Sequence, residues 1–302
     1  MFKKVMSVLL IAALILTSVF AFAACGDGKK SDSPKATEKA EVPASEAAYT
    51  SYKNALEKVI KLDNFHIRAN SDSTTTVTED NGTETVTKSL MNMEYCVTGI
   101  NSDDFALKMI MLAENEAEGE KQTMRSEAIY TKDRMYSRQS ETDKYMYLDY
   151  GPEASSQIID SVDDEAYDSM QPVSEKIFKD AKVTDNADGS KTIECVIDKE
   201  GGSELLANEI STILDNYEDM GAEAEITKIE GKYIIVVSAD GYPAKVDGDF
   251  NLEITVSVQG ISASVKVDLI LKIEFVDPGK PVTVNIPSEE ECEAYDYSET
   301  DY

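Results

Sequence analysis

Apolar and polar residues alternate along most of this chain, a pattern typical of half-buried β-strands. Short polar turns such as Asp80-Asn81-Gly82, Glu230-Gly231 and Asp240-Gly241 separate the alternating segments, so neighbouring strands are expected to pair as antiparallel hairpins. The predicted strands are Phe65 to Thr78, Glu84 to Thr98, Phe105 to Asn115, Gln122 to Thr131, Arg134 to Gln139, Tyr145 to Tyr150, Ala181 to Thr184, Ser190 to Ile197, Ala222 to Glu230, Lys232 to Ala239, Pro243 to Gln259, Ile261 to Val276 and Val282 to Ile286.

Apolar residues at helical spacing predict helices over Ser45 to Leu62 and Ser203 to Met220, and a weaker pattern predicts one within Pro152 to Phe178. So few helices exclude a doubly wound parallel sheet, because each parallel connection would need its own crossover. The fold class is therefore α+β and mainly β. We expect one large, mostly antiparallel sheet with one or two helices packed on a face.

The first 24 residues have the pattern of an export signal, with Lys3 and Lys4 ahead of the apolar run from Val8 to Val19. The residues after this run are compatible with two processing sites. Ala21-Phe22-Ala23 fits an ordinary cleavage site, whereas Ala21 to Gly26 also resembles a bacterial lipobox, which implies a diacylglycerol on Cys25. We favour lipidation, because residues 26–44 are a polar stretch typical of a tether.

Charge excludes one class of partner. The 302 residues include 58 acidic and 29 basic side chains, a net charge of −29 that becomes −31 when the leader and its two lysines are removed. Such a polyanion repels phosphate backbones, so no nucleic-acid binding is expected. No later apolar stretch approaches the roughly 20 residues of a membrane span.

Catalytic and metal-binding patterns are missing from the sequence. His66 is the single histidine, and no nucleophile motif accompanies it, so it is interpreted as structural. Cys96, Cys195 and Cys292 have no metal-ligand spacing and are expected to be isolated thiols, with a disulfide as the alternative. The sequence therefore predicts a protein that is not an enzyme and uses no cofactor or metal.

Methionine is concentrated in one region. Of 11 methionines, seven lie between residues 91 and 146. Strand alternation places Met91 and Met93 on one face, and Leu107, Met109 and Met111 on one face of the next strand. These five residues are our candidates for the lining of an apolar cavity, since methionine adapts to varied shapes. The alternative is that they fill an ordinary core.

The order of elements resembles that of half-barrel lipoproteins, a group related to bacterial lipoprotein-localisation factors and mycobacterial lipid-carrying lipoproteins. The resemblance rests on Tyr52-Lys53-Asn54-Ala55-Leu56, Leu62-Asp63-Asn64-Phe65, Gly241-Tyr242-Pro243 and the segment from Pro281 to Pro287. It implies a curved, unclosed antiparallel sheet, a half-barrel with helices on its concave face. It also implies an apolar cavity that holds acyl chains, and no catalytic residues.

These observations predict a signal peptide over residues 1–24, a lipidated Cys25 with a tether over 25–44, a single half-barrel over 45–287 and a disordered acidic tail over 288–302. The predicted function is non-enzymatic binding of an apolar or amphiphilic, lipid-like ligand at the outer face of a bacterial membrane. The alternative is a docking module that binds another envelope protein through acidic residues between Asp160 and Asp168.

Overall fold

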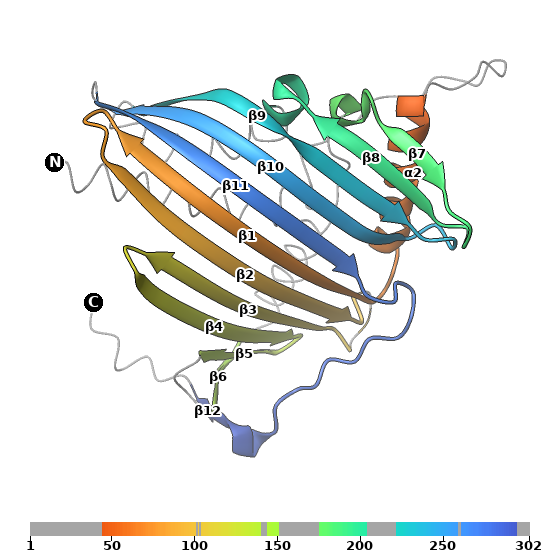
Figure 1. The fold of residues 1–302 in the computed structure, drawn as a ribbon. Coiled ribbons are helices and arrows are strands. Elements are labelled where there is room, and N and C mark those ends of the chain that lie inside the picture. Colours follow the sequence, from red (N-terminus) through yellow and green to blue (C-terminus); the bar gives the residue numbers. More distant parts are fainter. Residues whose placement is uncertain are drawn as a thin grey trace.

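A twelve-stranded sheet forms most of the described part of the molecule (Figure 1). The computed structural model describes residues 44–100, 102, 104–139, 144–150, 175–203, 222–258 and 261–294. Its elements are α2 (Ala44–Ile60), β1 (Phe65–Glu79), β2 (Glu84–Thr98), β3 (Ala106–Ala117), β4 (Glu120–Thr131), β5 (Arg134–Gln139), β6 (Tyr145–Asp149), η1 (Glu175–Phe178), β7 (Lys182–Asp185), β8 (Lys191–Ile197), β9 (Ala222–Val237), β10 (Pro243–Val258), β11 (Ile261–Phe275), η3 (Glu289–Glu291) and β12 (Cys292–Ala294).

The sheet is unclosed, as the sequence predicts. The strand order is β12-β6-β5-β4-β3-β2-β1-β11-β10-β9-β8-β7, so β12 and β7 are its two edges. Consecutive strands pair antiparallel from β1 to β6 and from β7 to β11, whereas β6 and β7 lie far apart in the sheet. The antiparallel pairing of β1 with β11 joins these two halves, from Ile67 opposite Phe275 to Glu79 opposite Ala263. The one departure among the described pairs is β12, which lies parallel to β6.

One face of the sheet, here called the inner face, carries the hydrophobic core. Along β11, Val265, Val267, Leu269 and Leu271 are at most 3% exposed, whereas the residues between them are exposed. Partners directly opposite each other share a face, so the pairing registers extend the inner face across the neighbouring strands. We call the opposite side the outer face.

Helix α2 packs on the inner face and lies behind β7 to β10 in Figure 1. Its buried stripe comprises Ala48, Tyr52, Ala55, Leu56 and Val59, which recur at the spacing that places them on one side of a helix. The Tyr52 ring lies 5.9 Å from the ring of Phe178 in η1. None of the helices among the described residues is long and apolar enough to cross a membrane.

The predicted turn at Glu230-Gly231 is wrong, because β9 continues through it. Gly231 is needed for packing instead of chain reversal. A Cβ atom added at Gly231 would lie 2.3 Å from the carbonyl oxygen of Asp249 and 2.9 Å from the ring of Phe250. The Phe250 side chain thus occupies the space that any other residue at this position would need.

The C-terminal segment also differs from expectation. Residues 281–288 pair with no strand, so the predicted strand over Val282 to Ile286 is wrong. The segment nevertheless packs on the outer face, where Val284 contacts the buried cluster of Ile129, Tyr136 and Tyr145. Order extends past Pro287, because η3 and β12 follow, whereas the sequence predicted a disordered tail from Ser288.

Several predicted segments fall outside the described residues: the leader, Cys25, the tether, most of the helices predicted over 152–178 and 203–220, and the acidic run from Asp160 to Asp168. A helix does begin near the second of these, because residues 199–203 are helical. The backbone N–H of Gly201 donates to Asp198 Oδ1 at 3.0 Å, which caps the first turn.

We expect Gly231→Ala to destabilise the fold by about 1–3 kcal/mol, because the added methyl group overlaps the Asp249 carbonyl and the Phe250 ring. Gly201→Ala is the matched control, since the nearest atoms to its added Cβ are 3.6 Å away. Urea unfolding followed by circular dichroism measures both. Equal unfolding midpoints for the two variants would show that Phe250 does not require a glycine beneath it.

Candidate ligand-binding face

The β2–β3 register brings all five candidate lining residues together on the inner face. Met93 lies opposite Met111, Val97 opposite Leu107, and Met91 opposite Ala113. Tyr95 lies opposite Met109, and its hydroxyl donates to the sulfur of Met93 at 3.7 Å.

Met93 and Leu107 are buried, whereas Met91, Met109 and Met111 are half-buried at the margin of the core. The structure therefore offers a soft apolar surface with three incompletely covered thioether side chains. We call these five residues and Tyr95 the methionine cluster.

A strip of buried hydroxyl groups lies beside this cluster, and the sequence analysis missed it. Its members, all at most 8% exposed, are Ser71, Ser73 and Thr75 of β1 and Thr87 and Ser89 of β2. Ser73 pairs with Ser89 and Thr75 with Thr87, so the five side chains form one continuous patch, here called the hydroxyl strip. The signal was present in the sequence, because serine and threonine occupy positions of β1 where the alternation calls for apolar residues.

The hydroxyl strip ends at a polar atom without a partner. Asn115 of β3 lies opposite Ser89, and its side-chain oxygen is buried with no hydrogen-bond partner in the part of the chain that the structure describes. A buried acceptor of this kind is uncommon in folded proteins and disfavours burial of the group by about 1–3 kcal/mol. The described residues therefore leave one acceptor of the inner face unsatisfied.

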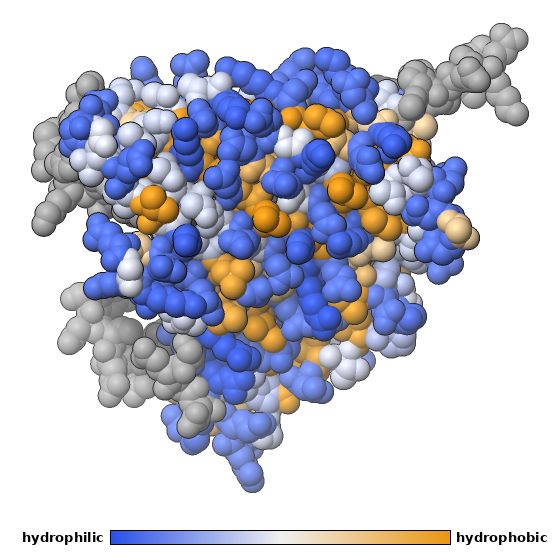
Figure 2. Space-filling model, viewed as in Figure 1, coloured by the Kyte–Doolittle hydropathy of each residue, from blue (hydrophilic) through white to orange (hydrophobic). Residues whose placement is uncertain are grey.

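Charged side chains are absent from the inner positions of the central strands. Within the described chain, the inner residues of β1 from Phe65 to Val77, of β2 from Thr85 to Val97 and of β3 from Leu107 to Ala117 include no Asp, Glu, Lys, Arg or His. The inner residues of β10 and β11 are equally neutral. The charges instead lie on the outer face, which is mostly hydrophilic in Figure 2.

Among the described residues, the carboxylate of Glu127 is buried on the outer face. Glu127 of β4 forms two ion pairs. Lys108 Nζ lies 2.6 Å from its Oε1, and Arg138 Nη2 lies 2.7 Å from its Oε2. Burial alone would raise the pKa of Glu127, but hydrogen bonds from Lys108, Tyr145 and Arg138 outweigh it and lower the pKa to about 2. Two cations thus neutralise this carboxylate, and the group clamps β3, β4 and β5 together.

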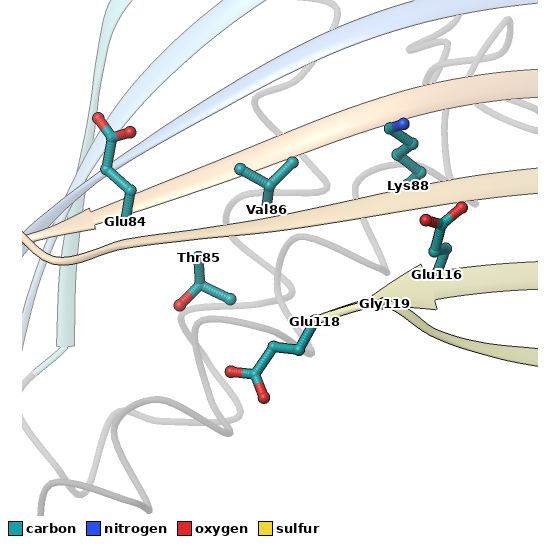
Figure 3. Close-up of a pocket in the computed structure, with 7 residues that line it drawn as sticks. All are labelled: Glu84, Thr85, Val86, Lys88, Glu116, Glu118 and Gly119. Carbon is teal, nitrogen blue, oxygen red and sulfur yellow. The ribbon is translucent and has the colours of Figure 1, made fainter.

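A separate cleft of about 350 Å³ lies where β2 begins and β3 turns into β4 (Figure 3). Its lining residues are Glu84, Thr85, Val86, Lys88, Glu116, Glu118 and Gly119. None of the five candidate lining residues belongs to it. Its lining is mostly polar, so this cleft differs from the apolar cavity that the sequence analysis predicts.

A family model for DUF6612, a family of unknown function, matches residues 48–289. The chain belongs to this family. No curated protein matches the chain. Among solved structures, it is similar to a beta-barrel-like protein of the domain of unknown function DUF1849 from Brucella abortus. That similarity has 10% identity, covers 72% of this chain and 100% of the other, and has a TM-score of 0.17, a value too low to indicate function.

Glu127 makes stability depend on pH in a defined direction. Its pKa is lower in the folded chain than the ordinary 4.5, so its contribution is present above about pH 4.5 and is lost as the pH falls towards 2. We expect Glu127→Gln to be less stable than wild type at pH 6, with the difference narrowing by pH 3. Urea unfolding at the two pH values measures this, and the exposed Glu120→Gln is the control. A difference independent of pH would contradict the assignment.

Proposed function

We propose that this chain is a non-enzymatic lipoprotein, held at the outer face of a bacterial cytoplasmic membrane, whose inner sheet face binds an apolar or amphiphilic, lipid-like ligand. The observation that carries this proposal is the methionine cluster. Met91, Met109 and Met111 remain half-buried on a face whose central strands bear no charge. An acyl chain laid against them would bury apolar surface that the described core leaves incompletely covered, at about 0.8 kcal/mol per methylene.

The neutral inner face restricts the chemistry of the ligand. An ionised group placed there would lose its hydration without meeting an opposite charge, which strongly disfavours binding. The hydroxyl strip and Asn115 suit neutral polar groups, such as ester or hydroxyl groups, next to the apolar cluster. The proposed ligand is therefore uncharged where it contacts the sheet, and any charged headgroup extends to solvent.

Membrane attachment is proposed from the sequence. A diacylglycerol on Cys25 supplies two acyl chains, which anchor a protein far more stably than a single chain does. The polar residues 26–44 would then separate the sheet from the membrane surface. The non-enzymatic role is supported by the inner face, whose described central positions on β1, β2 and β3 carry no Asp, Glu, His, Lys or Cys side chain for acid–base or nucleophilic chemistry.

The methionine cluster yields a test with matched variants. We expect the double variant Met109→Gln, Met111→Gln to lose most binding of a fluorescent fatty-acid probe, because an amide replaces each thioether at nearly the same size. Met109→Leu, Met111→Leu keeps the surface apolar and should retain binding. Val196→Gln is the control for adding an amide outside the cluster, because Val196 is 63% exposed, and this variant should bind the probe as wild type does. Equal probe affinity in the Gln and Leu variants, both folded by circular dichroism, would contradict the assignment.

The anchor is tested independently in cells. We expect Cys25→Ser to abolish incorporation of labelled palmitate and to move the chain from the membrane fraction towards the soluble fraction, because the acylated thiol is lost. Cys292→Ser is the control and should remain in the membrane fraction. Persistent palmitate labelling of the Cys25→Ser chain would show that the lipid is attached elsewhere.

A further inference from the structure

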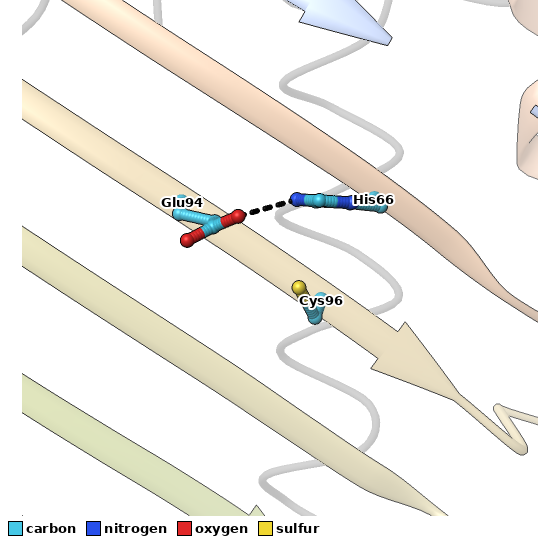
Figure 4. Close-up of side chains that lie close together, drawn as sticks. All are labelled: His66, Glu94 and Cys96. Atoms are coloured by element: carbon cyan, nitrogen blue, oxygen red, sulfur yellow. Dashed lines mark hydrogen bonds and ion pairs between the residues drawn. The ribbon is translucent and has the colours of Figure 1, made fainter. Parts of the chain in front are cut away.

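Three side chains with metal-binding atoms meet on the outer face of the central strands (Figure 4). His66 lies on β1 directly opposite Cys96 on β2, and Glu94 is two residues before Cys96 on the same face. The grouping depends on strand register, because residues 66 and 96 are remote in sequence. No spacing motif in the sequence could therefore have revealed it.

The three groups lie close enough to share one ion. One ligand atom from each side chain lies within 4.8 Å of the other two, and His66 Nε2 is 2.7 Å from Glu94 Oε1. Bonds of about 2.0–2.3 Å to Zn²⁺ allow ligand atoms to be separated by at most about 4.6 Å, so small side-chain rotations suffice. All three residues are half-buried, which holds their rotamers while leaving access from solvent.

We propose that His66, Glu94 and Cys96 form a binding site for a divalent transition-metal ion with the preferences of Zn²⁺. An imidazole nitrogen, a carboxylate oxygen and a thiolate sulfur together suit Zn²⁺ better than they suit Ca²⁺ or Mg²⁺, which prefer oxygen ligands alone. Three protein ligands on an open face leave a fourth position for water. Binding replaces the hydrogen bond between His66 and Glu94 and releases the Cys96 thiol proton to solvent.

Neighbouring cations orient the site and compete with the ion. Arg68 Nε lies 3.1 Å from Glu94 Oε1, and Arg68 Nη1 lies 4.0 Å from Glu274. The guanidinium therefore fixes the Glu94 carboxylate beside His66, and one carboxylate oxygen must turn from it towards the metal. Lys108 lies opposite Cys96 in the register, but its ammonium group pairs with Glu127 at 2.6 Å.

A nucleophilic Cys–His–Glu arrangement fits this place less well. Acyl transfer needs backbone N–H donors aimed at the developing oxyanion. Both β1 and β2 are interior strands, flanked by β11 and β3, so their N–H groups serve the ladders on either side. The described face around Cys96 therefore lacks an evident oxyanion hole, and metal binding is the chemistry that the geometry favours.

The test is titration of the purified full chain with Zn²⁺ in a chelator-free buffer by isothermal calorimetry. We expect one Zn²⁺ per chain, with binding lost in both His66→Gln and Cys96→Ser. Cys292→Ser and the exposed Glu120→Gln are the controls, since they remove a thiol and an acid outside the site, and both should bind as wild type does. Co²⁺ should give a thiolate charge-transfer band that Cys96→Ser lacks and Cys292→Ser keeps.

Two outcomes overturn the proposal: wild type that binds no stoichiometric Zn²⁺, or binding unchanged by Cys96→Ser. Circular dichroism of the metal-free variants checks their folding. If Cys96→Ser does not fold, wild type alone decides the question through alkylation with iodoacetamide and peptide mapping. Zn²⁺ should then slow alkylation of Cys96 and leave Cys292 unaffected, and equal alkylation of Cys96 with and without Zn²⁺ overturns the site.

Discussion

Strict alternation along paired strands is the constraint on which the rest of the structure depends, because it keeps the charges of a heavily charged chain off the inner face, where the core forms. The long register between β1 and β11 holds Val265, Val267 and Leu269 on the inner face and Lys266 and Asp268 on the outer face. A shift of one residue would reverse every side chain of a strand and place Lys266 and Asp268 in the core. With 58 acidic residues in the chain, this register is strongly specified.

The same constraint divides the inner face into regions of different chemistry. The inner residues of β10 and β11 are apolar and pack beneath α2, which makes this region the structural core. The hydroxyl strip on β1 and β2 and the methionine cluster on β2 and β3 extend the neutral face beyond this core. On the outer face, Glu127 with Lys108 and Arg138 ties neighbouring strands through charge, as does the Arg68 contact with Glu94. One sheet thus presents a neutral surface and an ionic surface back to back.

Much of this architecture could be predicted from alternation alone. The strands Glu84–Thr98 and Arg134–Gln139 begin and end where the pattern indicates, and the methionines share the face that their spacing requires. Failures occurred where a residue's role depends on a distant partner. Glu230-Gly231 is a typical turn sequence, but Gly231 lies within β9, where it packs against the Phe250 ring of β10.

For the same reason, the sequence pattern did not predict the C-terminal strand β12 or the His66, Glu94 and Cys96 cluster. The three-residue β12 has no pattern of its own and is defined by its pairing with β6. His66 meets Glu94 and Cys96 through the pairing of β1 with β2, and not through a spacing of ligand residues within one segment. The hydroxyl strip is different, because its serines and threonines interrupt the apolar alternation of β1, so the sequence of that strand alone indicates it.

We propose that the neutral inner face binds the uncharged part of a lipid-like ligand. Mass spectrometry of an organic extract tests it most directly, using residues 26–302, which include every described element, purified from a bacterial host without detergent. We expect a lipid at close to one molecule per folded chain, with its amount reduced in the Met109→Gln, Met111→Gln variant. A well-folded protein whose extract contains no stoichiometric lipid would contradict it.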